Sequence, residues 1–304
     1  MRPATRGATA GVHHRPRPRC PGRTVPDRVA GFALMDRIEW QSLPSDLHSA
    51  VQDELGPIIK VEPTSEGRRS ALATVAHLKD GPVFLKGAPI ANERAAAQLD
   101  REAAVNPHVR SVTPELLCDL TAGGWRLLGF EHVQGRRADY TPGSRDLNAV
   151  LDVFATLEHL QLPTTVDVMW FEGRWSDYAT VPQHLTQIAG TALLHTDLNP
   201  GNVIITGTAA RLVDWGMASR GTPLVNPADL VINLIACGHA PTEAEALMAG
   251  LDTWKNADPA VLDYYARLLA TTWLEAFWTP THPWARAVVN AAVQWAMHRR
   301  HSRH

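Results

Sequence analysis

Short apolar runs bounded by turn residues occupy the first part of the chain and predict a small antiparallel sheet. The runs are Ile58–Val61, Ala71–His77, Pro82–Lys86, Val112–Leu120 and Trp125–Phe130. Their length and their β-branched or aromatic residues are typical of strands. Asp80-Gly81 and the segment Ala122–Gly124 supply tight turns between neighbouring runs. Five antiparallel strands are therefore expected.

Apolar residues recur at helical spacing in most of the remaining chain. Helices are predicted over Trp40–Leu55, Ala91–Val105, Asp146–Leu160, Gln183–Thr191, Glu243–Leu251, Pro259–Trp278 and Trp284–Arg299, with a further one from Asp229 through Cys237. The helix that starts at Ala91 should end at Pro107, because proline cannot continue the backbone hydrogen-bond pattern. The chain is therefore expected to be α+β, with a five-stranded sheet and a helix first and a mainly helical part after it.

Composition limits the classes of protein that the chain can represent. Its 304 residues are 45% hydrophobic, enough for two lobes or one large domain with a sizeable core. The net charge of −2 gives no reason to expect nucleic acid, and no run of about eighteen apolar residues predicts a membrane span. A soluble cytoplasmic protein, monomeric or weakly dimeric, is expected.

Two segments of unusual composition each allow a functional and a non-functional interpretation. Residues 1–34 hold seven arginines against one acid, Asp27, among repeated prolines, so we expect a disordered extension. An arginine-rich arm for an anionic partner is the alternative. His298, His301 and His304 could bind a metal loosely, although a solvated basic tail is the favoured reading. The three cysteines share no short metal-type spacing and predict no zinc site.

The segment His195–Gly216 concentrates the residues that suit phosphoryl transfer. Asn202 follows Asp197 by five residues, and Val203–Ile205 and Leu212-Val213 read as two strands joined by a turn. Such a hairpin sets Asn202 and Asp214 at neighbouring ends. One carboxylate and one amide oxygen, completed by nucleotide phosphates, form a typical Mg²⁺ site, and Asp197 remains to accept a hydroxyl proton. An ordinary surface turn is the alternative for the Asp-Leu-Asn-Pro-Gly stretch alone.

The order of these residues resembles a known family. His195–Asn202 follows the H-x-D-x-x-x-x-N pattern and Asp214-Trp215-Gly216 follows the metal motif of the protein-kinase-like fold. The combination is similar to the aminoglycoside phosphotransferase family. This resemblance implies a bilobal fold, with a nucleotide-binding lobe over 35–131 and a catalytic and acceptor-binding lobe over 132–304. It also implies transfer of the γ-phosphoryl group of ATP, with Mg²⁺, to a hydroxyl of a small molecule.

The resemblance implies that a lysine binds the phosphates and that a glutamate orients this lysine. Lys86 ends an apolar strand, where an ammonium group needs a partner. Glu102, on the following predicted helix, is the expected partner, and Glu93 is the competing choice. In kinase-like folds this lysine grips the α and β phosphates and the glutamate orients it.

Two further nucleotide contacts follow from the order of the elements. The loop Ser65–Ser70, with Gly67 and Ser70, occupies the place of a nucleotide-covering turn, although a lone glycine there also fits a plain hairpin. The stretch from Glu131 to Gly135, including Val133, is expected to be the hinge whose backbone pairs with adenine.

The acceptor is expected to be small. Only Trp215–Ala228 separates Asp214 from Asp229, which leaves little room for a peptide-docking segment. Asp229 is expected either to brace backbone N–H groups beneath the catalytic loop or simply to be an acid at a helix N-terminus. A cationic antibiotic such as an aminoglycoside would need acids, which are available as Glu158, Asp167, Glu172, Asp177, Glu243, Glu245 and Asp263. A choline, homoserine or sugar kinase, and a pseudokinase without transfer activity, are the alternatives.

Overall fold

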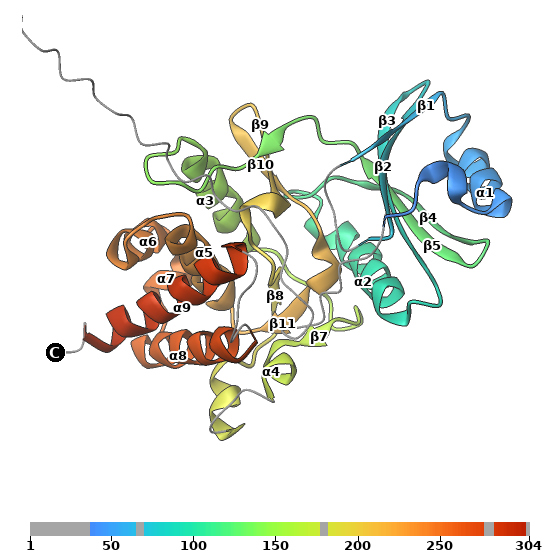
Figure 1. Cartoon of the computed structure of the whole chain (residues 1–304). Coiled ribbons are helices and arrows are strands. Elements are labelled where there is room, and N and C mark those ends of the chain that lie inside the picture. Colours follow the sequence, from blue (N-terminus) through green and yellow to red (C-terminus); the bar gives the residue numbers. More distant parts are fainter. Residues whose placement is uncertain (1–36, 65–69, 177–181, 277–282, 302–304) are drawn as a thin grey trace, which may run out of the picture.

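The computed structural model describes residues 37–64, 70–176, 182–276 and 283–301. The predicted N-terminal extension and Gly67 lie outside the described residues. A sheet-based N-terminal lobe and a mainly helical C-terminal lobe lie side by side, and the pair β9 (Val203–Thr206) and β10 (Ala209–Leu212) lies between them (Figure 1). The predicted α+β architecture is confirmed.

The N-terminal lobe contains the expected five-stranded sheet. Its spatial order is β1 (Lys60–Pro63), β2 (Leu72–Leu78), β3 (Gly81–Pro89), β5 (Trp125–Glu131) and β4 (Leu116–Ala122). Every neighbouring pair is antiparallel. The boundaries differ from the predicted ones by a few residues, because apolar runs do not mark the first and last paired residues.

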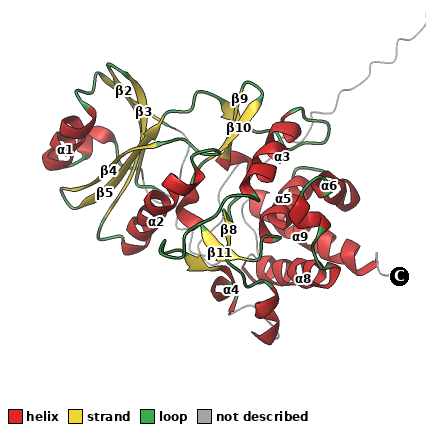
Figure 2. Cartoon of the chain, turned by 180° about the vertical axis from the view of Figure 1, so that it is seen from behind, coloured by secondary structure: helices red, strands yellow, loops and turns green. Residues whose placement is uncertain are grey.

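Alternation along β3 gives the sheet two buried faces. Val83 and Leu85 pack with the helix α1 (Ser45–Leu55), whereas Phe84 and Ala88 pack with α2 (Glu93–Val109). Successive side chains of a strand point to opposite faces, so a single strand serves both layers. The helices α1 and α2 therefore cover opposite faces of the sheet (Figure 2).

The helix α2 is longer than predicted, because it continues through Pro107 to Val109. The proline removes only its own N–H donor near the end of the helix, so the last turn persists. The side chain of Asn106 fixes this end, since its amide donates to the carbonyl of Pro114 and accepts from the N–H of Leu116.

The C-terminal lobe is built from helices around one large core. The longer helices are α3 (Asp146–Leu157), α5 (Val225–Ala236), α6 (Pro241–Met248), α8 (Pro259–Ala276) and α9 (Pro283–His301), and short ones are α4 (Phe171–Arg174) and α7 (Asp252–Lys255). Short 3-10 helices are η1 (Trp40–Ser42), η3 (Pro182–Gln187), η4 (Pro200–Asn202) and η5 (Trp215–Met217). No described helix is long and apolar enough to span a membrane.

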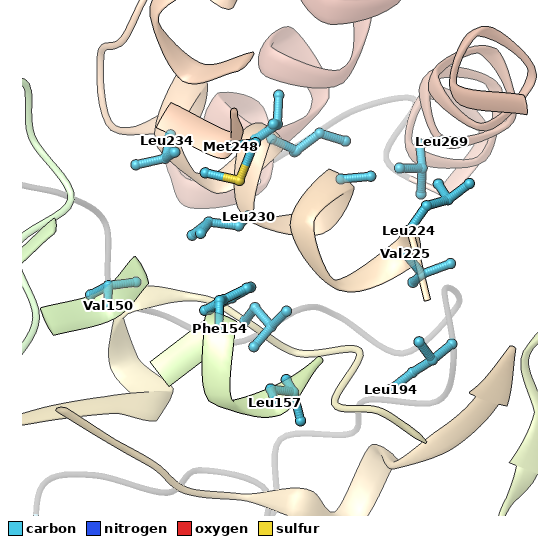
Figure 3. Close-up of a cluster of buried hydrophobic side chains, with 14 of the residues drawn as sticks. Val150, Phe154, Leu157, Leu194, Leu224, Val225, Leu230, Leu234, Met248 and Leu269 are labelled. Carbon is cyan, nitrogen blue, oxygen red and sulfur yellow. The ribbon is translucent and has the colours of Figure 1, made fainter. Parts of the chain in front are cut away.

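Apolar side chains from separate helices meet in this core (Figure 3). Val150, Phe154 and Leu157 of α3 point toward Leu230 and Leu234 of α5. Their spacing follows the helical repeat, so each helix buries one face. The packing fixes α5 beneath the segment that carries the catalytic motif.

Two small sheets accompany the helices, and of their strands the sequence predicts only the β9–β10 hairpin. One contains β10, β9 and β6 (Arg136–Arg137), and the other contains β7 (Met169–Trp170), β11 (Ser219–Gly221) and β8 (Ala192–Leu194). The helix predicted over Gln183–Thr191 is therefore wrong. A 3-10 helix ends at Gln187, and the chain then runs toward β8 with Gly190 against the backbone of Gly221.

We predict that Gly190→Ala destabilises the fold by about 1–3 kcal/mol, the usual cost of overpacking. A Cβ at this position would lie 2.5 Å from the carbonyl oxygen of Gly221, and that backbone is held in the sheet. Gly173→Ala is the control, because its Cβ would meet no atom within 4 Å. Urea unfolding of both variants measures the difference, and equal midpoints would contradict the predicted clash.

Candidate active site

The predicted hairpin brings the two proposed metal ligands to adjacent positions. Strands β9 and β10 pair in antiparallel register, with Gly207 at φ 64° in the turn between them. Asn202 precedes the first strand and Asp214 follows the second, and the N–H of Val213 donates to the carbonyl of Asn202 at 2.9 Å. The two side chains enter the same cavity.

Lys86 is paired with two carboxylates. Its Nζ lies 2.7 Å from Oε2 of Glu102 and 2.7 Å from Oδ1 of Asp214. The expected partner Glu102 is confirmed, and Glu93 stands instead in the first turn of α2. Burial alone would lower the pKa of Lys86, but the carboxylates of Asp214 and Glu102 outweigh burial and raise this pKa above its usual value. The ammonium group therefore keeps its charge at neutral pH.

Glu102 also fixes the position of the metal motif. Its Oε1 accepts a hydrogen bond from the backbone N–H of Trp215 at 3.2 Å. Asp214, the residue before, has φ 67°, a left-handed conformation that costs a non-glycine residue free energy. The contacts of Glu102 and Lys86 on either side of this peptide hold Asp214 in place.

Asp197 is oriented by two amides. The Nδ2 of Asn199 donates to Oδ1 of Asp197 at 2.9 Å, and the Nδ2 of Asn202 donates to Oδ2 at 2.5 Å. Because Asn202 uses its NH₂ group here, its amide oxygen is the atom left to act as a ligand. The proposed base and the proposed metal ligand are therefore directly connected.

Thr196 holds a strained backbone beside the base. Its φ of 61° is an outlier for a β-branched residue. Its Oγ1 donates to the carbonyl of Met217 at 2.7 Å and accepts from Nη1 of Arg174 at 2.6 Å. These two bonds fix the peptide that precedes Asp197.

The brace beneath the loop is Asn226 rather than Asp229. The Oδ1 of Asn226 accepts from the N–H of His195, and its Nδ2 donates to the carbonyl of Leu193, each at 3.0 Å. Asp229 lies one turn further along α5, where it accepts a hydrogen bond from the Tyr265 hydroxyl at 2.7 Å. Both earlier readings of Asp229 are therefore wrong.

The first cavity has a volume of about 390 Å³, a size typical of small-ligand sites. Lys86, Glu102, Asn202 and Asp214 all line it. Apolar side chains from both lobes also line it, among them Val75, Phe84, Phe130, Ile204 and Val213. Three other predicted nucleotide contacts, Ser70, Glu131 and Val133, also line it.

A second, smaller cavity of about 60 Å³ is lined by the loop residues that precede those at the first cavity. Asp197, Thr196 and Asn199 form its loop wall, and Asp229 and Arg174 add charged groups. Most of the remaining lining is apolar or aromatic and includes Phe171, Trp175, Trp273 and Trp284, and Asn233 adds an amide. Asp197 thus borders this cavity, while its hydrogen-bond partner Asn202 borders the first.

Arg174 and Asn226 escaped the sequence analysis. Each lies far along the chain from the loop that it contacts, and neither stands in a recognisable motif. The sequence offers only a general indication: the buried backbone N–H and C=O groups of this loop need hydrogen-bond partners from other parts of the chain.

Comparison with known proteins identifies the architecture. The model of the Phosphotransferase enzyme family matches residues 142–265, which include the catalytic loop and the metal motif. This match confirms the family resemblance. A search of curated protein sequences finds no significant match.

Solved structures show the same protein-kinase-like fold. Choline kinase LicA from Streptococcus pneumoniae is 13% identical, with a TM-score of 0.58, over 83% of this chain and 98% of that chain. The aminoglycoside phosphotransferase APH(4)-Ia, as a thermostable mutant, is 14% identical with a TM-score of 0.58, over 82% and 98%. An aminoglycoside phosphotransferase from Alicyclobacillus acidocaldarius is 14% identical with a TM-score of 0.58, over 87% and 96%.

We predict a distinct pH dependence of stability from Asp229. Burial raises its pKa to about 7, above the value of about 4 for a carboxyl group in an unfolded chain. Between these values the folded protein holds a proton that the unfolded chain has released, so the free energy of unfolding falls as the pH rises. Below the lower value both states are protonated, and above the higher one neither is.

Asp229→Asn removes this titration and keeps an oxygen for Tyr265. The stability of the variant relative to the parent should therefore increase with pH across that interval and level off above it. Urea unfolding at a series of pH values provides the measurement, with the exposed Asp53→Asn as control. A pH-independent difference for Asp229→Asn would refute the assignment.

Proposed function

We propose that the protein is an ATP-dependent O-phosphotransferase that acts on a small molecule. The observation that carries this proposal is the arrangement of two cavities along one loop. Lys86, Asn202 and Asp214 line the larger cavity, and Asp197 lines the smaller one. A nucleotide in the first and a hydroxyl compound in the second would meet at Asp197.

Bound ligands in the similar structures support this division. LicA has been solved in complex with AMP, and a mutant of APH(4)-Ia in a ternary complex with AMP-PNP and hygromycin B. A nucleotide is therefore compatible with this fold, and so is an acceptor bound beside it. Identities of 12–14% carry no information on which acceptor this chain takes.

The larger cavity fits a nucleoside triphosphate with a divalent ion. Its apolar walls suit a purine base, and we propose that the backbone around Glu131 and Val133 contacts the base edge. The charged Lys86 would bind the α and β phosphates, and Ser70 lies at the same cavity.

Mg²⁺ fits the oxygen atoms of Asn202 and Asp214, which are the hard ligands that this ion prefers. No cluster of three or more His, Cys, Asp or Glu residues that could hold a metal occurs within the described ranges, so nucleotide phosphates would complete the site. A bound Mg²⁺ would neutralise negative charge on the phosphates during transfer.

Asp197 would act as the general base. The hydroxyl oxygen of the acceptor forms a bond to the γ-phosphorus, the bond from that phosphorus to the leaving ADP oxygen breaks, and the hydroxyl proton passes to Asp197. The amides of Asn199 and Asn202 hold both carboxylate oxygens before the acceptor arrives. This preorganisation orients the base for the attacking hydroxyl.

A small acceptor suits the short path between the metal motif and α5. After Asp214 the chain forms η5, then β11, and then starts α5 at Val225. All of these elements pack in the lobe, so this interval offers no peptide-docking segment. A choline-, homoserine- or sugar-type kinase and an antibiotic kinase share these requirements, whereas a pseudokinase would bind nucleotide without transfer.

We predict that Asp197→Asn lowers turnover by about two or more orders of magnitude, the usual scale for loss of a general base. MgATP binding should remain nearly unchanged, because Asp197 does not border the larger cavity. Coupled ADP release and calorimetric titration with MgATP measure the two quantities, with Asp53→Asn as control. Normal turnover in Asp197→Asn would exclude the assigned role.

We predict that Asp214→Ala weakens ATP binding in the presence of Mg²⁺ more than in its absence. The substitution removes a metal ligand and leaves Lys86 paired with Glu102. Lys86→Met is the matched variant, because it should weaken binding of ATP with and without the metal. Calorimetric titrations with and without Mg²⁺ distinguish the two patterns, and an equal loss for Asp214→Ala in both would argue against metal binding by this residue.

A further inference from the structure

The smaller cavity contains an arginine whose bonding capacity is largely unused. Arg174 donates one hydrogen bond, from Nη1 to Oγ1 of Thr196 at 2.6 Å, and its buried Nε has no partner. It makes no ion pair with any residue in the described part of the chain. Guanidinium has five N–H donors, so several remain for a ligand.

A second arginine of the same lobe shows what a purely structural guanidinium looks like here. Arg220 is 3% exposed and donates to the carbonyls of Leu162, Pro163 and Val166. Its donors are satisfied by backbone oxygens, and it lines neither cavity. Arg174 differs on both points, since it borders the cavity beside the proposed base and lacks such partners.

Aromatic rings support Arg174 from behind. Its guanidinium carbon lies 5.8 Å from the centroid of the Phe171 ring and 5.9 Å from that of Trp175. Such rings attract a cation, but they do not replace the oxygen atoms that would accept hydrogen bonds from its N–H groups. The rings therefore hold the guanidinium in place, and its remaining N–H groups still require oxygen atoms as hydrogen-bond acceptors.

Arg174 is a cation beside two acids that line the same cavity, Asp197 and Asp229. Burial lowers the pKa of Arg174 to about 10, so the group remains charged at neutral pH. Asp229, Tyr265, Asp197 and Arg101 are the other groups that act on it electrostatically. Burial raises the pKa of Asp229 to about 7, so this acid is partly protonated at neutral pH and compensates Arg174 only in part.

Four of the acids that a polycationic acceptor could use are engaged elsewhere. Glu158 accepts from the backbone N–H groups of Asp252 and Thr253, and Glu243 caps the start of α6 at Ala240. Glu245 and Asp263 pair with Arg299. None of these acids lines the smaller cavity.

We propose that Arg174 binds an anionic group of the acceptor, so that the substrate is a small hydroxy acid rather than an amino alcohol or an aminoglycoside. The proposal rests on the proposed function, because it places the acceptor in the cavity that Asp197 borders. The hydroxyl of such a compound lies at Asp197, and its carboxylate, at the other end of an apolar body, lies at Arg174. The aromatic walls contact the body between them.

Three compounds of equal length share a terminal hydroxyl and differ in the charge of the group at the other end. They are γ-hydroxybutyrate, butanediol with hydroxyls at both ends, and the corresponding amino alcohol. Binding is measured in the presence of MgADP by the fluorescence of the tryptophans around the cavity, and transfer from ATP is measured by ADP release. The parent should favour the acid over the amino alcohol by at least about tenfold, as expected for a charged hydrogen bond.

The variants Arg174→Gln and Arg174→Lys then test the residue, with the exposed Arg94→Gln as control. Arg174→Gln should abolish the preference for the acid over the diol and the amino alcohol, because only the acid loses a charged partner. Arg174→Lys should retain part of the preference, since it keeps the charge but loses the fork of donors. Circular dichroism of each variant verifies that it is folded.

Several results would overturn the proposal. One is a parent that binds the amino alcohol or hygromycin B better than γ-hydroxybutyrate. Another is an equal loss of transfer to all three compounds in Arg174→Gln, which would place the arginine on the transferred phosphoryl group instead. In both cases phosphoryl transfer itself stands, whereas absence of MgATP binding in the parent would refute the proposed function.

Discussion

The ion pairs of Lys86 with Glu102 and Asp214 are the interaction on which the site depends. They join three elements that are separate in the chain, namely β3, α2 and the segment after β10. Two of these belong to the N-terminal lobe and one to the C-terminal lobe, so the ammonium group links the two lobes at the larger cavity. Removing one partner would leave an uncompensated buried charge, which is strongly destabilising.

Alternation of apolar residues along β3 explains why the lysine reaches this position. Leu85 points to the α1 face, so its neighbour Lys86 must point to the α2 face, where Glu102 stands. The same face carries Phe84 and Phe130, which wall the larger cavity. The strand pattern therefore determines both the core of the lobe and the location of the charged group.

Sequence reasoning succeeded where a feature is local. Strands, the β9–β10 hairpin and the pairing of Lys86 with Glu102 follow from periodicity, turn residues and the known order of the motifs. It failed at the segment before β8, where the partner strand β11 and the contact of Gly190 with Gly221 decide the backbone. It also failed for Asn226, Asp229 and Arg174, because their side chains contact residues distant in the chain, and the neighbouring sequence does not indicate such partners.

The surroundings of Asp214, at the proposed nucleotide site, differ from those of Thr196, at the proposed acceptor site. Asp214 and Thr196 are the two non-glycine residues with positive φ in the described part of the chain; the first is the proposed metal ligand, and the second precedes the proposed base. Around Asp214 the polar groups are paired among themselves through Lys86 and Glu102. Around Thr196 the hydroxyl is satisfied, whereas Arg174, which lines the smaller cavity, has a buried Nε without a hydrogen-bond partner. The polar groups on the nucleotide side are thus paired before any ligand binds, whereas the acceptor side keeps unused hydrogen-bond donors on Arg174, so specificity should reside there.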